Sequence, residues 1–456
     1  MMITDTIVAI STPLGEGAIG IIRMSGHQAF EIVDAFFRPA SHKARVNREL
    51  VYGHIMDGDV VVDEVMVVKM AAPNTYTREP IVEINCHGGI IPLREILSLA
   101  LRHGARLAEK GEFTQRAFLN GRIDLAQAES VMDLISAKTR RGFDLALNQL
   151  EGYLSSRVRS IRDNLIALMA QIEVGIDYPE EDIEDITYHE ISAQLMVSSE
   201  QISKLLENAN NGKIIREGLK TVIVGKPNVG KSSLMNALLR DSRAIVTEIA
   251  GTTRDLIEEF LNIGGIPIKL VDTAGIRDTE DIVEKIGVER SKGVFNEADL
   301  VIFMLNASES ITDEDLQIME LVKEKHAIVL INKTDLPQMI DEAVINEHLH
   351  DKKIIRISIE KEIGLVDVEK AIQEMVFSNQ IDYNQNELVS NSRHIDLLKK
   401  ALVHCNEAYS ATSNQMPYDF IEVDIKDAIL YLGQITGESV EKDLLNNIFS
   451  NFCLGK

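Results

Sequence analysis

The chain has no run of about eighteen apolar residues, which is the length that a membrane-spanning helix needs. Its first residues lack the basic start and apolar stretch of a secretory signal, so we expect no leader peptide. Cysteine is scarce as well. Cys86, Cys405 and Cys453 are far apart and form no C-x-x-C pair, which excludes a disulfide framework and suggests a reducing compartment. These shortages predict a cytoplasmic protein without a membrane partner.

Basic residues are also in deficit. There are 47 Lys and Arg against 71 Asp and Glu, and the formal net charge is −24. Nucleic-acid binding normally uses a clustered basic surface, so a nucleic-acid partner would need a local basic patch or the help of a second protein. The 456 residues are 45% hydrophobic and 26% charged. This composition is typical of a globular protein with two or three domains.

Two kinds of pattern occupy the first half of the chain. Residues 1–120 contain short β-rich runs separated by Gly/Pro turns, which predicts an α+β domain. From about residue 122 the apolar period becomes helical. One stripe with 4-3-4-3-4 spacing indicates a bundle helix and consists of Leu154, Val158, Ile161, Leu165, Leu168 and Ile172. A further helix is expected to end near Asn210-Asn211-Gly212.

Residues 219–378 alternate apolar strands with helices, which is typical of a parallel α/β sheet. The expected strands are Leu219–Val224, Ile268–Val271, Leu300–Leu305, Ala327–Ile331 and Ile354–Ile357. After about residue 380 the pattern is helical again, so we expect the α/β block to be inserted into a helical domain. The predicted division is 1–120, 121–212, 213–379 and 380–456, and the second and fourth parts form one helical domain.

A phosphate-binding loop follows the first of these strands. Residues Gly225-Lys226-Pro227-Asn228-Val229-Gly230-Lys231-Ser232 fit G-x-x-x-x-G-K-S at every fixed position, and a helix continues from Ser233. In such a loop, backbone N–H groups cradle the phosphates, the lysine reaches the outer phosphates and the serine hydroxyl binds Mg²⁺. The sequence therefore predicts a Ras-like P-loop domain.

Two further strand ends carry motifs that identify the nucleotide. Asp272-Thr273-Ala274-Gly275 places a carboxylate near Mg²⁺ and an N–H near the γ-phosphate. In Asn332-Lys333-Thr334-Asp335, the Asp335 carboxylate can accept hydrogen bonds from guanine N1–H and N2–H₂, which adenine does not offer. GTP is therefore the expected substrate. Ser358-Ile359-Glu360 stands where such proteins usually have a Ser-Ala-Lys-like loop, so the contacts to the base stay open.

The details of these motifs resemble one class of GTPases. Ile276 follows the Asp-x-x-Gly motif where Ras-like proteins have a water-positioning glutamine. This apolar residue, together with the segment from Ile245 to Asp255 that contains Gly251-Thr252-Thr253-Arg254, resembles the pattern of the Era/Der/MnmE class.

Segments of the first 120 residues and of the C-terminal tail resemble the MnmE (TrmE) family. They include Phe452-Cys453-Leu454-Gly455-Lys456, Gly20-Ile21-Ile22-Arg23-Met24-Ser25-Gly26, Cys86-His87-Gly88-Gly89 and Gly111-Glu112-Phe113-Thr114. Leu454 conservatively replaces the isoleucine usual in that tail.

The resemblance covers the whole chain and implies a function. It implies a homodimer whose N-terminal domain binds a folate one-carbon carrier, 5-formyl- or methylene-tetrahydrofolate. It also implies a heterotetramer with the FAD-dependent protein MnmG (GidA), and modification of the tRNA wobble uridine to a 5-aminomethyl or 5-carboxymethylaminomethyl form. A partner that binds tRNA would resolve the conflict with the acidic charge.

The resemblance also assigns residues of the GTPase site. Mg²⁺ is assigned to Ser232 and Thr253, and K⁺ to Asn228, Thr247, Ile249 and Thr252. The less favoured alternative is that Asn228 only shapes its loop. The catalytic candidates are Glu284, which would orient the attacking water, together with Arg254 and Cys453. Without the resemblance, Glu284 would rank as a solvated charge beside Glu280 and Asp281. We expect GTP to contact Asn228, Val229, Gly230, Lys231, Ser232, Ser233, Thr247, Ile249, Thr252, Thr253, Asp272, Thr273, Ala274, Gly275, Asn332, Lys333, Asp335 and Ser358.

For folate, the family positions correspond to Arg23, Glu83, Arg122 and Lys456, and Arg122 replaces a lysine found in some members. A carboxylate suits the pterin N–H groups and cations suit the glutamate tail. Without the resemblance, Arg23 and Glu83 could be ordinary strand residues. Cys453 could position or activate the one-carbon unit, or it could only pack the tail.

A different class of function competes with this reading. Relatives of the Era or Der type are regulatory or ribosome-assembly GTPases without substrate chemistry. Those proteins have a KH-type RNA module or a second GTPase domain, and this chain shows neither a basic G-x-x-G segment nor a second P-loop. The architecture therefore favours the modification enzyme. Cys86-His87-Gly88-Gly89 has no second ligand pair, and a tight turn is enough to explain it.

Overall fold

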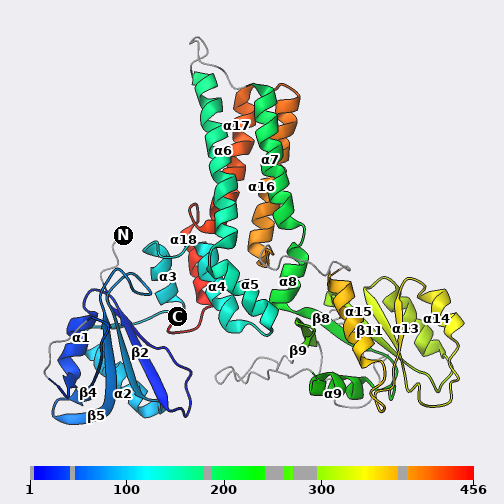
Figure 1. Cartoon of the computed structure of the whole chain (residues 1–456), viewed down its shortest axis with the longest axis horizontal. Helices are drawn as coiled ribbons and strands as arrows, with labels where there is room; N and C mark the ends of the chain where they lie inside the picture. The colour runs from blue at the N-terminus through cyan, green and yellow to red at the C-terminus, as the bar shows by residue number, and fades with distance from the viewer. Residues whose placement is uncertain (1–4, 42–46, 178–186, 242–259, 271–294, 378–387) are drawn as a thin grey trace.

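The computed structural model of the chain describes residues 5–41, 47–177, 187–241, 260–270, 295–377 and 388–456. Its helices and strands form an N-terminal sheet with helices, an upright bundle of helices and a second sheet with helices (Figure 1). This is the mixture of α/β and all-α regions that the sequence predicts. Within the described ranges, no helix is long and apolar enough to cross a bilayer.

The N-terminal region is built on a seven-stranded sheet in the order β3-β4-β5-β6-β2-β1-β7. Neighbouring strands are antiparallel except β1 and β7. The strands are β1 (Ile7–Ile10), β2 (Ile19–Ser25), β3 (Phe37–Pro39), β4 (Leu50–Asp57), β5 (Val60–Met70), β6 (Ile81–His87) and β7 (Arg106–Leu107). Helices α1 (Ala29–Phe36) and α2 (Ile90–Arg102) share an apolar core with one face of this sheet.

Strand alternation places two of the candidate folate residues together. Ile22, Met24, Val82 and Ile84 are buried in the core, so the residues between them lie on the opposite face. Arg23 of β2 stands directly opposite Glu83 of β6 in the antiparallel register. This pairing follows from the strand register alone.

Four long helices lie side by side as the upright bundle of Figure 1. They are α6 (Tyr153–Asp177), α7 (Tyr188–Leu206), α16 (Ser392–Ser413) and α17 (Tyr418–Thr436). Every member of the predicted stripe on α6 is at most 3% exposed, which confirms its role as a bundle seam. Shorter helices lie in the lower part of the helical region: α3 (Glu112–Leu119), α4 (Leu125–Ser136), α5 (Arg140–Leu150), α8 (Ala209–Glu217) and α18 (Lys442–Ser450).

The helix end predicted at Asn210-Asn211-Gly212 is wrong. Helix α7 already ends at Leu206, and the separate helix α8 runs through these three residues to Glu217. Gly212 is required for packing instead, because a Cβ atom there would lie 2.4 Å from the backbone oxygen of Val389. The glycine therefore lets a distant segment approach the helix closely and does not cap it.

The second sheet has six strands in the order β13-β12-β11-β8-β10-β9, and all neighbours are parallel except β9 and β10. The strands are β8 (Leu219–Val224), β9 (Phe260–Ile263), β10 (Ile266–Leu270), β11 (Leu300–Asn306), β12 (Ala327–Asn332) and β13 (Lys353–Arg356). All five expected strands are present, and their described ends are shifted by at most two residues; Val271, the expected end of the second strand, lies outside the described residues. The antiparallel edge strand β9 was not predicted.

Helices cover both faces of this sheet. Helices α9 (Lys231–Asp241) and α15 (Leu365–Phe377) share one apolar cluster with it. Helices α13 (Asp313–Lys323) and α14 (Glu342–His348) share the cluster on the other face. A parallel sheet buried on both sides is the arrangement expected for a P-loop fold.

The chain leaves the helical region and returns to it at one place. The Gln149 amide donates to Ser390 Oγ at 3.1 Å, and the Ser392 hydroxyl donates to Glu217 Oε1 at 3.1 Å. One core cluster contains apolar residues of α6 and α7 together with those of α16 and α17. The helical region is therefore formed by two chain segments, with the second sheet inserted between them.

Candidate functional site

The predicted phosphate-binding loop connects β8 to α9. The Lys231 ammonium lies inside the loop, where Nζ donates to the backbone oxygens of Gly225 and Lys226, each at 2.7 Å. Burial lowers the pKa of Lys231, and the negative charge of Glu314 partly opposes this shift. The ammonium is thus held at the loop by two carbonyl groups that phosphate oxygens could replace. Ser232 follows in the first turn of α9, and its hydroxyl is the hard oxygen ligand that Mg²⁺ prefers.

The backbone of this loop depends on its glycines. Gly225 has φ 146° and Gly230 has φ 110°, and a Cβ atom on Gly230 would lie 2.4 Å from Asn332 Nδ2. Asn228 has φ 64°, in the left-handed region that asparagine tolerates better than most residues, and it is exposed. Its conformation is that expected of a loop-shaping residue, and its exposed side chain leaves the K⁺ hypothesis open.

Lys226 anchors the loop, although the motif leaves its position free. Its Nζ lies 2.7 Å from Asp315 Oδ2 and donates to Thr312 Oγ1 at 3.1 Å. Both partners belong to the capping box at the start of α13, and Asp315 is only 1% exposed. Sequence reasoning missed this contact, because the T-x-x-D pattern marks a helix start but does not show which cation it meets.

The guanine-specificity motif is joined to both neighbouring loops. Asn332 Nδ2 donates to the backbone oxygen of Val229 at 2.8 Å, and Asn332 Oδ1 accepts from Ile359 N at 3.3 Å. Asn332 therefore links the phosphate-binding loop to the loop that begins at Ser358. Lys333, with φ 63°, turns the chain between Asn332 and Asp335.

Ser358, the serine that this loop shares with the Ser-Ala-Lys pattern, contacts the guanine-specificity motif. Ser358 is fully buried, and its hydroxyl donates to Asp335 Oδ1 at 2.6 Å. This hydrogen bond is the main cause that lowers the pKa of the Asp335 carboxyl, and a backbone hydrogen bond adds to the shift. Ser358 thus holds the specificity carboxylate ionised and in one orientation.

Many of the predicted GTPase residues lie outside the described ranges. These are Thr247, Ile249, Thr252, Thr253, Arg254, Asp272, Thr273, Ala274, Gly275 and Glu284. The described members of the predicted GTP site come from the ends of β8 and β12 and from the loop after β13. Because parallel strands present these ends at the same edge of a sheet, they form one site.

A second cluster of polar residues lies on the N-terminal sheet. Arg23 Nε donates to Glu83 Oε1 at 2.8 Å, and the two side chains are only 18% and 23% exposed. The Arg122 guanidinium lies 4.5 Å from the ring centre of Tyr76, and that of Arg23 lies 5.7 Å from the same ring. Tyr76 therefore connects two candidate folate residues from distant segments, a contact that the sequence did not indicate.

The C-terminal tail docks at this cluster. Phe113 N donates to the backbone oxygen of Lys456 at 3.2 Å, Gly111 N to that of Cys453 at 3.3 Å, and the Ser11 hydroxyl to that of Gly455 at 3.3 Å. Figure 1 accordingly places the end of the chain near α3, between the N-terminal sheet and the helices. Burial lowers the pKa of the Lys456 ammonium. The nearby Arg23 guanidinium lowers it further, and Cys453 and Glu83 oppose the shift.

The four candidate folate residues are therefore brought together with Cys453. Arg23, Arg122 and Lys456 supply three cations beside the single carboxylate of Glu83. The Cys453 side chain is exposed, whereas Cys86 and Cys405 are buried. A site with several cations, one carboxylate, an aromatic ring and an accessible thiol can bind an anionic aromatic ligand.

Two known protein families match the chain, one in its N-terminal region and one over the rest of its length. The family described as GTP-binding protein TrmE N-terminus matches residues 6–122, and the MnmE helical domain matches residues 125–453. The tRNA modification GTPase MnmE of Alkaliphilus oremlandii is 56% identical over 461 residues, which is 100% of both chains. The chain belongs to the MnmE family. It is therefore a GTPase, which confirms the prediction made from its motifs.

Other MnmE proteins are similar over the same length. Those of Clostridioides difficile and Bacillus subtilis are 52% and 49% identical, covering 100% and 99% of this chain and 100% of each relative. Among solved structures, the FeoB G-domain of Methanococcus jannaschii is 28% identical over 35% of this chain and 98% of its own, with a TM-score of 0.25. A likeness at that score adds nothing to the MnmE assignment.

Proposed function

We propose that this MnmE protein is a K⁺-dependent GTPase that modifies the wobble uridine of tRNA at C5. In this proposal it acts with an FAD-dependent flavoprotein of the MnmG (GidA) type and uses a folate one-carbon unit to form an aminomethyl or carboxymethylaminomethyl group. The relatives named above are tRNA modification GTPases, which supports the action on tRNA. The cation, the flavoprotein and the folate rest on the resemblance described above.

One observation carries the proposal, namely the convergence of the C-terminal tail with the N-terminal sheet. Lys456 and Cys453 come from the end of the chain, Arg23 and Glu83 from adjacent strands, and Arg122 from the segment before α4. In a chain of net charge −24, a cluster of three cations around one carboxylate is unusual. Binding of an anionic ligand would explain why the cations are gathered there. Folate fits this set: Glu83 would bind pterin N–H groups and the cations would bind the glutamate tail.

For the GTPase half of the reaction, the proposed roles follow the motifs. Lys231 and the loop N–H groups bind the phosphates, and Ser232 with Thr253 and Asp272 holds Mg²⁺. Asn228, Thr247, Ile249 and Thr252 would hold K⁺ beside the β- and γ-phosphates, where a cation stabilises the charge that develops during hydrolysis. Glu284 would orient the attacking water, with Arg254 as a further catalytic candidate. Asp335, oriented by Ser358, would select guanine.

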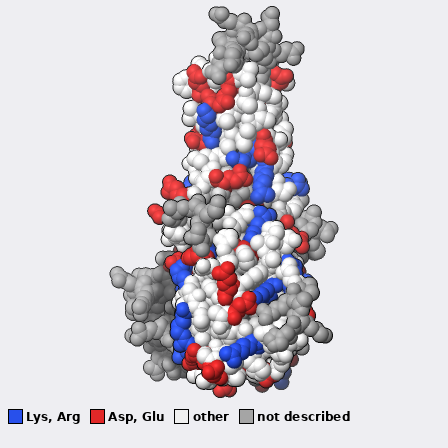
Figure 2. All heavy atoms as spheres, turned by 90° about the vertical axis from the view of Figure 1, so that its left-hand side faces the viewer, with Lys and Arg blue, Asp and Glu red and all other residues white. Residues whose placement is uncertain are grey.

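The proposed assembly is a homodimer in the cytoplasm that forms a heterotetramer with the flavoprotein. The distribution of charge on this chain supports the proposal that the flavoprotein makes most of the contacts to tRNA. On the face shown in Figure 2, basic and acidic side chains are interspersed and the described residues form no continuous basic surface. We therefore assign most of the tRNA contact to the partner. The parts 1–120, 121–212, 213–379 and 380–456 are proposed as the domain boundaries.

The deciding experiment is mass spectrometry of tRNA nucleosides from cells that lack this chain. Rescue with the wild type should restore 5-substituted wobble uridines, and rescue with Cys453→Ser should not. Cys405→Ser is the matched control, because that thiol is buried in the bundle core. If the modified uridines persist without the chain, the protein is a regulatory GTPase and the modification role is wrong.

The cation is tested separately from the tRNA chemistry. GTP hydrolysis should be much faster in K⁺ than in Na⁺ at equal ionic strength, and equal rates would rule out the K⁺ site. Glu284→Gln should abolish turnover while nucleotide affinity stays near that of the wild type, and Glu280→Gln serves as the control. Normal turnover of Glu284→Gln would remove the proposed role.

A further inference from the structure

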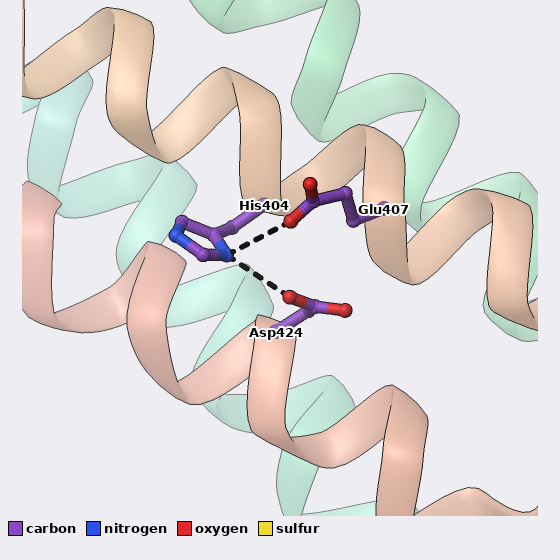
Figure 3. Close-up of side chains that lie close together, drawn as sticks. All are labelled: His404, Glu407 and Asp424. Atoms are coloured by element: carbon purple, nitrogen blue, oxygen red, sulfur yellow. Dashed lines mark hydrogen bonds and ion pairs between the residues drawn. The ribbon is translucent and has the colours of Figure 1, made fainter.

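Three side chains that neither the GTPase nor the folate site uses meet on the side of the helical bundle. His404 and Glu407 lie one turn apart on α16, and Asp424 faces them from α17 (Figure 3). His404 Nδ1 lies 2.9 Å from Asp424 Oδ1 and 3.3 Å from Glu407 Oε2. One ligand atom from each residue lies within 4.8 Å of the other two.

The imidazole is held in place by the bundle. The His404 ring stacks on Tyr431 of α17, with ring centres 5.6 Å apart and planes 19° from parallel. The next residues toward the interior, Cys405 and Ile425, are fully buried in the bundle core. The His404 and Asp424 side chains are each 23% exposed. The cluster is therefore packed against the bundle core on one side and open to water on the other. A ring fixed from behind with its Nδ1 toward two carboxylates is preorganised for a ligand.

Charge in the cluster is not balanced. A neutral imidazole offers one N–H to two carboxylates, and an imidazolium offers one positive charge against two negative ones. Among the described residues, no lysine or arginine forms an ion pair with Glu407 or Asp424. The nearby Lys400 pairs with Asp396 at 2.7 Å and lies 5.8 Å from the ring centre of Tyr431. A divalent cation would neutralise the remaining charge.

We propose that His404, Glu407 and Asp424 bind a Zn²⁺ ion that joins α16 to α17. An imidazole with two carboxylates suits Zn²⁺, whereas Mg²⁺ and Ca²⁺ prefer oxygen ligands alone. Zinc–ligand bonds of about 2.0–2.2 Å put neighbouring donor atoms of a tetrahedral site roughly 3.3–3.6 Å apart. The distances from His404 Nδ1 to the two carboxylates, 2.9 and 3.3 Å, are close to this range, and the third pair of donor atoms lies within 4.8 Å. A His and a carboxylate three residues apart on one helix, completed from a facing helix, is also how other bundles bind metals.

Binding changes the bonds of the cluster in a defined way. The Nδ1 lone pair binds the ion, so the neutral ring carries its proton on Nε2, and the carboxylates keep their charge. The fourth position faces water. The ion would replace one hydrogen bond between α16 and α17 by three metal–ligand bonds. Helix α16 returns from the GTPase region and α17 leads to the Cys453 tail, so the ion would fasten the two helices that connect these sites.

The test uses the full-length chain, stripped of metal by a chelator and dialysed against buffered Zn²⁺ with excess Mg²⁺. Atomic emission should find about one more bound Zn²⁺ per chain in the wild type than in His404→Gln or Asp424→Asn, with affinity lowered at least about tenfold in the variants. His87→Gln is the matched control, because His87 Nδ1 contacts only one carboxylate, that of Asp63 at 2.6 Å, and should keep the ion. Equal zinc in all four proteins would overturn the proposal.

Two further measurements keep the result independent of folding. The variants should hydrolyse GTP like the wild type and show the same circular dichroism, and the exposed Glu407→Gln should lose affinity without any loss of fold. Co²⁺ in place of Zn²⁺ should give visible ligand-field bands without a thiolate charge-transfer band. A thiolate band that persists in His404→Gln and disappears in Cys453→Ser would place the metal at the tail cysteine and reject the site on α16 and α17.

Discussion

The three cysteines differ in what surrounds each sulfur atom. Cys86 belongs to β6, and its side chain lies in the apolar core of the N-terminal region. Its Sγ donates to the Gly20 backbone oxygen at 3.3 Å, and burial raises its pKa to about 11. Burial alone raises the pKa of Cys405, in the bundle core, to about 12. Cys453 is exposed in the docked tail. Because the thiolate is the reactive form, accessibility and pKa together decide which sulfur can react.

At the residue scale, we expect one thiol per native chain to react with iodoacetamide near neutral pH. Peptide mapping should place the label on Cys453, and Cys453→Ser should remove nearly all of it. All three cysteines should react once the chain is denatured, because the burial that suppresses two of them is then lost. Labelling of Cys405 as fast as Cys453 in the native protein would contradict the described packing.

The contrast among the cysteines also shows which properties of a single residue can be predicted from the sequence. A lone cysteine is usually buried, and nothing local to Cys453 distinguishes it from Cys405. Only the resemblance of the tail singled it out. The contacts that support its role come from Gly111, Phe113 and Ser11, which are hundreds of positions away in the chain. Tertiary contacts of this separation leave no periodic signal in the sequence.

Helix α8 shows how an element can be misread from its residue types. Asn-Asn-Gly is a common helix end, yet here it lies in a helix that continues for five more residues, to Glu217. Position 212 needs glycine because the returning segment crosses it at Val389. The long stripe of α6 and the five strands were predictable because their periods repeat many times. A single close contact between distant segments does not repeat.

At the element scale, Gly212→Ala tests this packing. Alanine favours a helix by about 1 kcal/mol over glycine, so an open position would be stabilised. Here the added methyl group meets the Val389 carbonyl, and overpacking costs roughly 1–3 kcal/mol. We expect a lower midpoint of thermal unfolding by circular dichroism. Asn210→Ala, on the exposed side of the same helix, should change it little. A raised midpoint for Gly212→Ala would show that the segment can move away.

A buried network fastens both ends of the insertion to helix α4. Glu129 Oε2 lies 2.6 Å from Arg393 Nη2 and 2.7 Å from His394 Nε2, at the start of α16. One turn later, Asp133 Oδ1 accepts from Arg216 Nε of α8 at 2.8 Å. Burial alone would raise the pKa of Glu129, but His394 and then Arg393 lower it to about 2. Burial raises the pKa of Asp133 against the opposing Arg216.

This network predicts a pH dependence. Because the folded pKa of Glu129 lies below its ordinary value of 4.5, its charge stabilises the fold fully above about pH 4.5. That contribution is lost as the pH falls toward 2. Glu129→Gln should lower the free energy of unfolding by roughly 3 kcal/mol near neutral pH, since it leaves buried cations without their carboxylate. The difference from the wild type should shrink on acidification.

Calorimetry between about pH 3 and 7 would measure this difference. Glu200→Gln, on the exposed side of α7, is the control and should follow the wild type throughout. A constant difference at all pH values would mean that the variant acts through packing rather than through charge. The partners of Glu129 are 264 and 265 residues away in the chain, so no local pattern could have identified them.

At the scale of the whole molecule, the polypeptide brings its two ends into one site and inserts the GTPase region between two segments of one helical region. The Ser11 hydroxyl and the Gly455 oxygen, which share a hydrogen bond, are 444 positions apart. The insertion is fastened where α8 leaves and α16 returns, next to α4, and α4 follows directly after Arg122 of the proposed folate site. A continuous set of packed elements therefore connects the two sites.

The whole-molecule charge leads to the last prediction. A surface with 71 acidic and 47 basic side chains, interspersed as in Figure 2, offers few places to release counterions from tRNA. We therefore expect the chain alone to bind labelled tRNA weakly in fluorescence anisotropy, with a shallow dependence of affinity on salt equivalent to about one or two phosphate contacts. Adding the flavoprotein partner should give tight binding with a steep salt dependence. Tight binding with a steep salt dependence by the chain alone would require a basic surface on a face that Figure 2 does not show or in residues outside the described ranges. The partner would then be needed for its flavin rather than for holding the RNA.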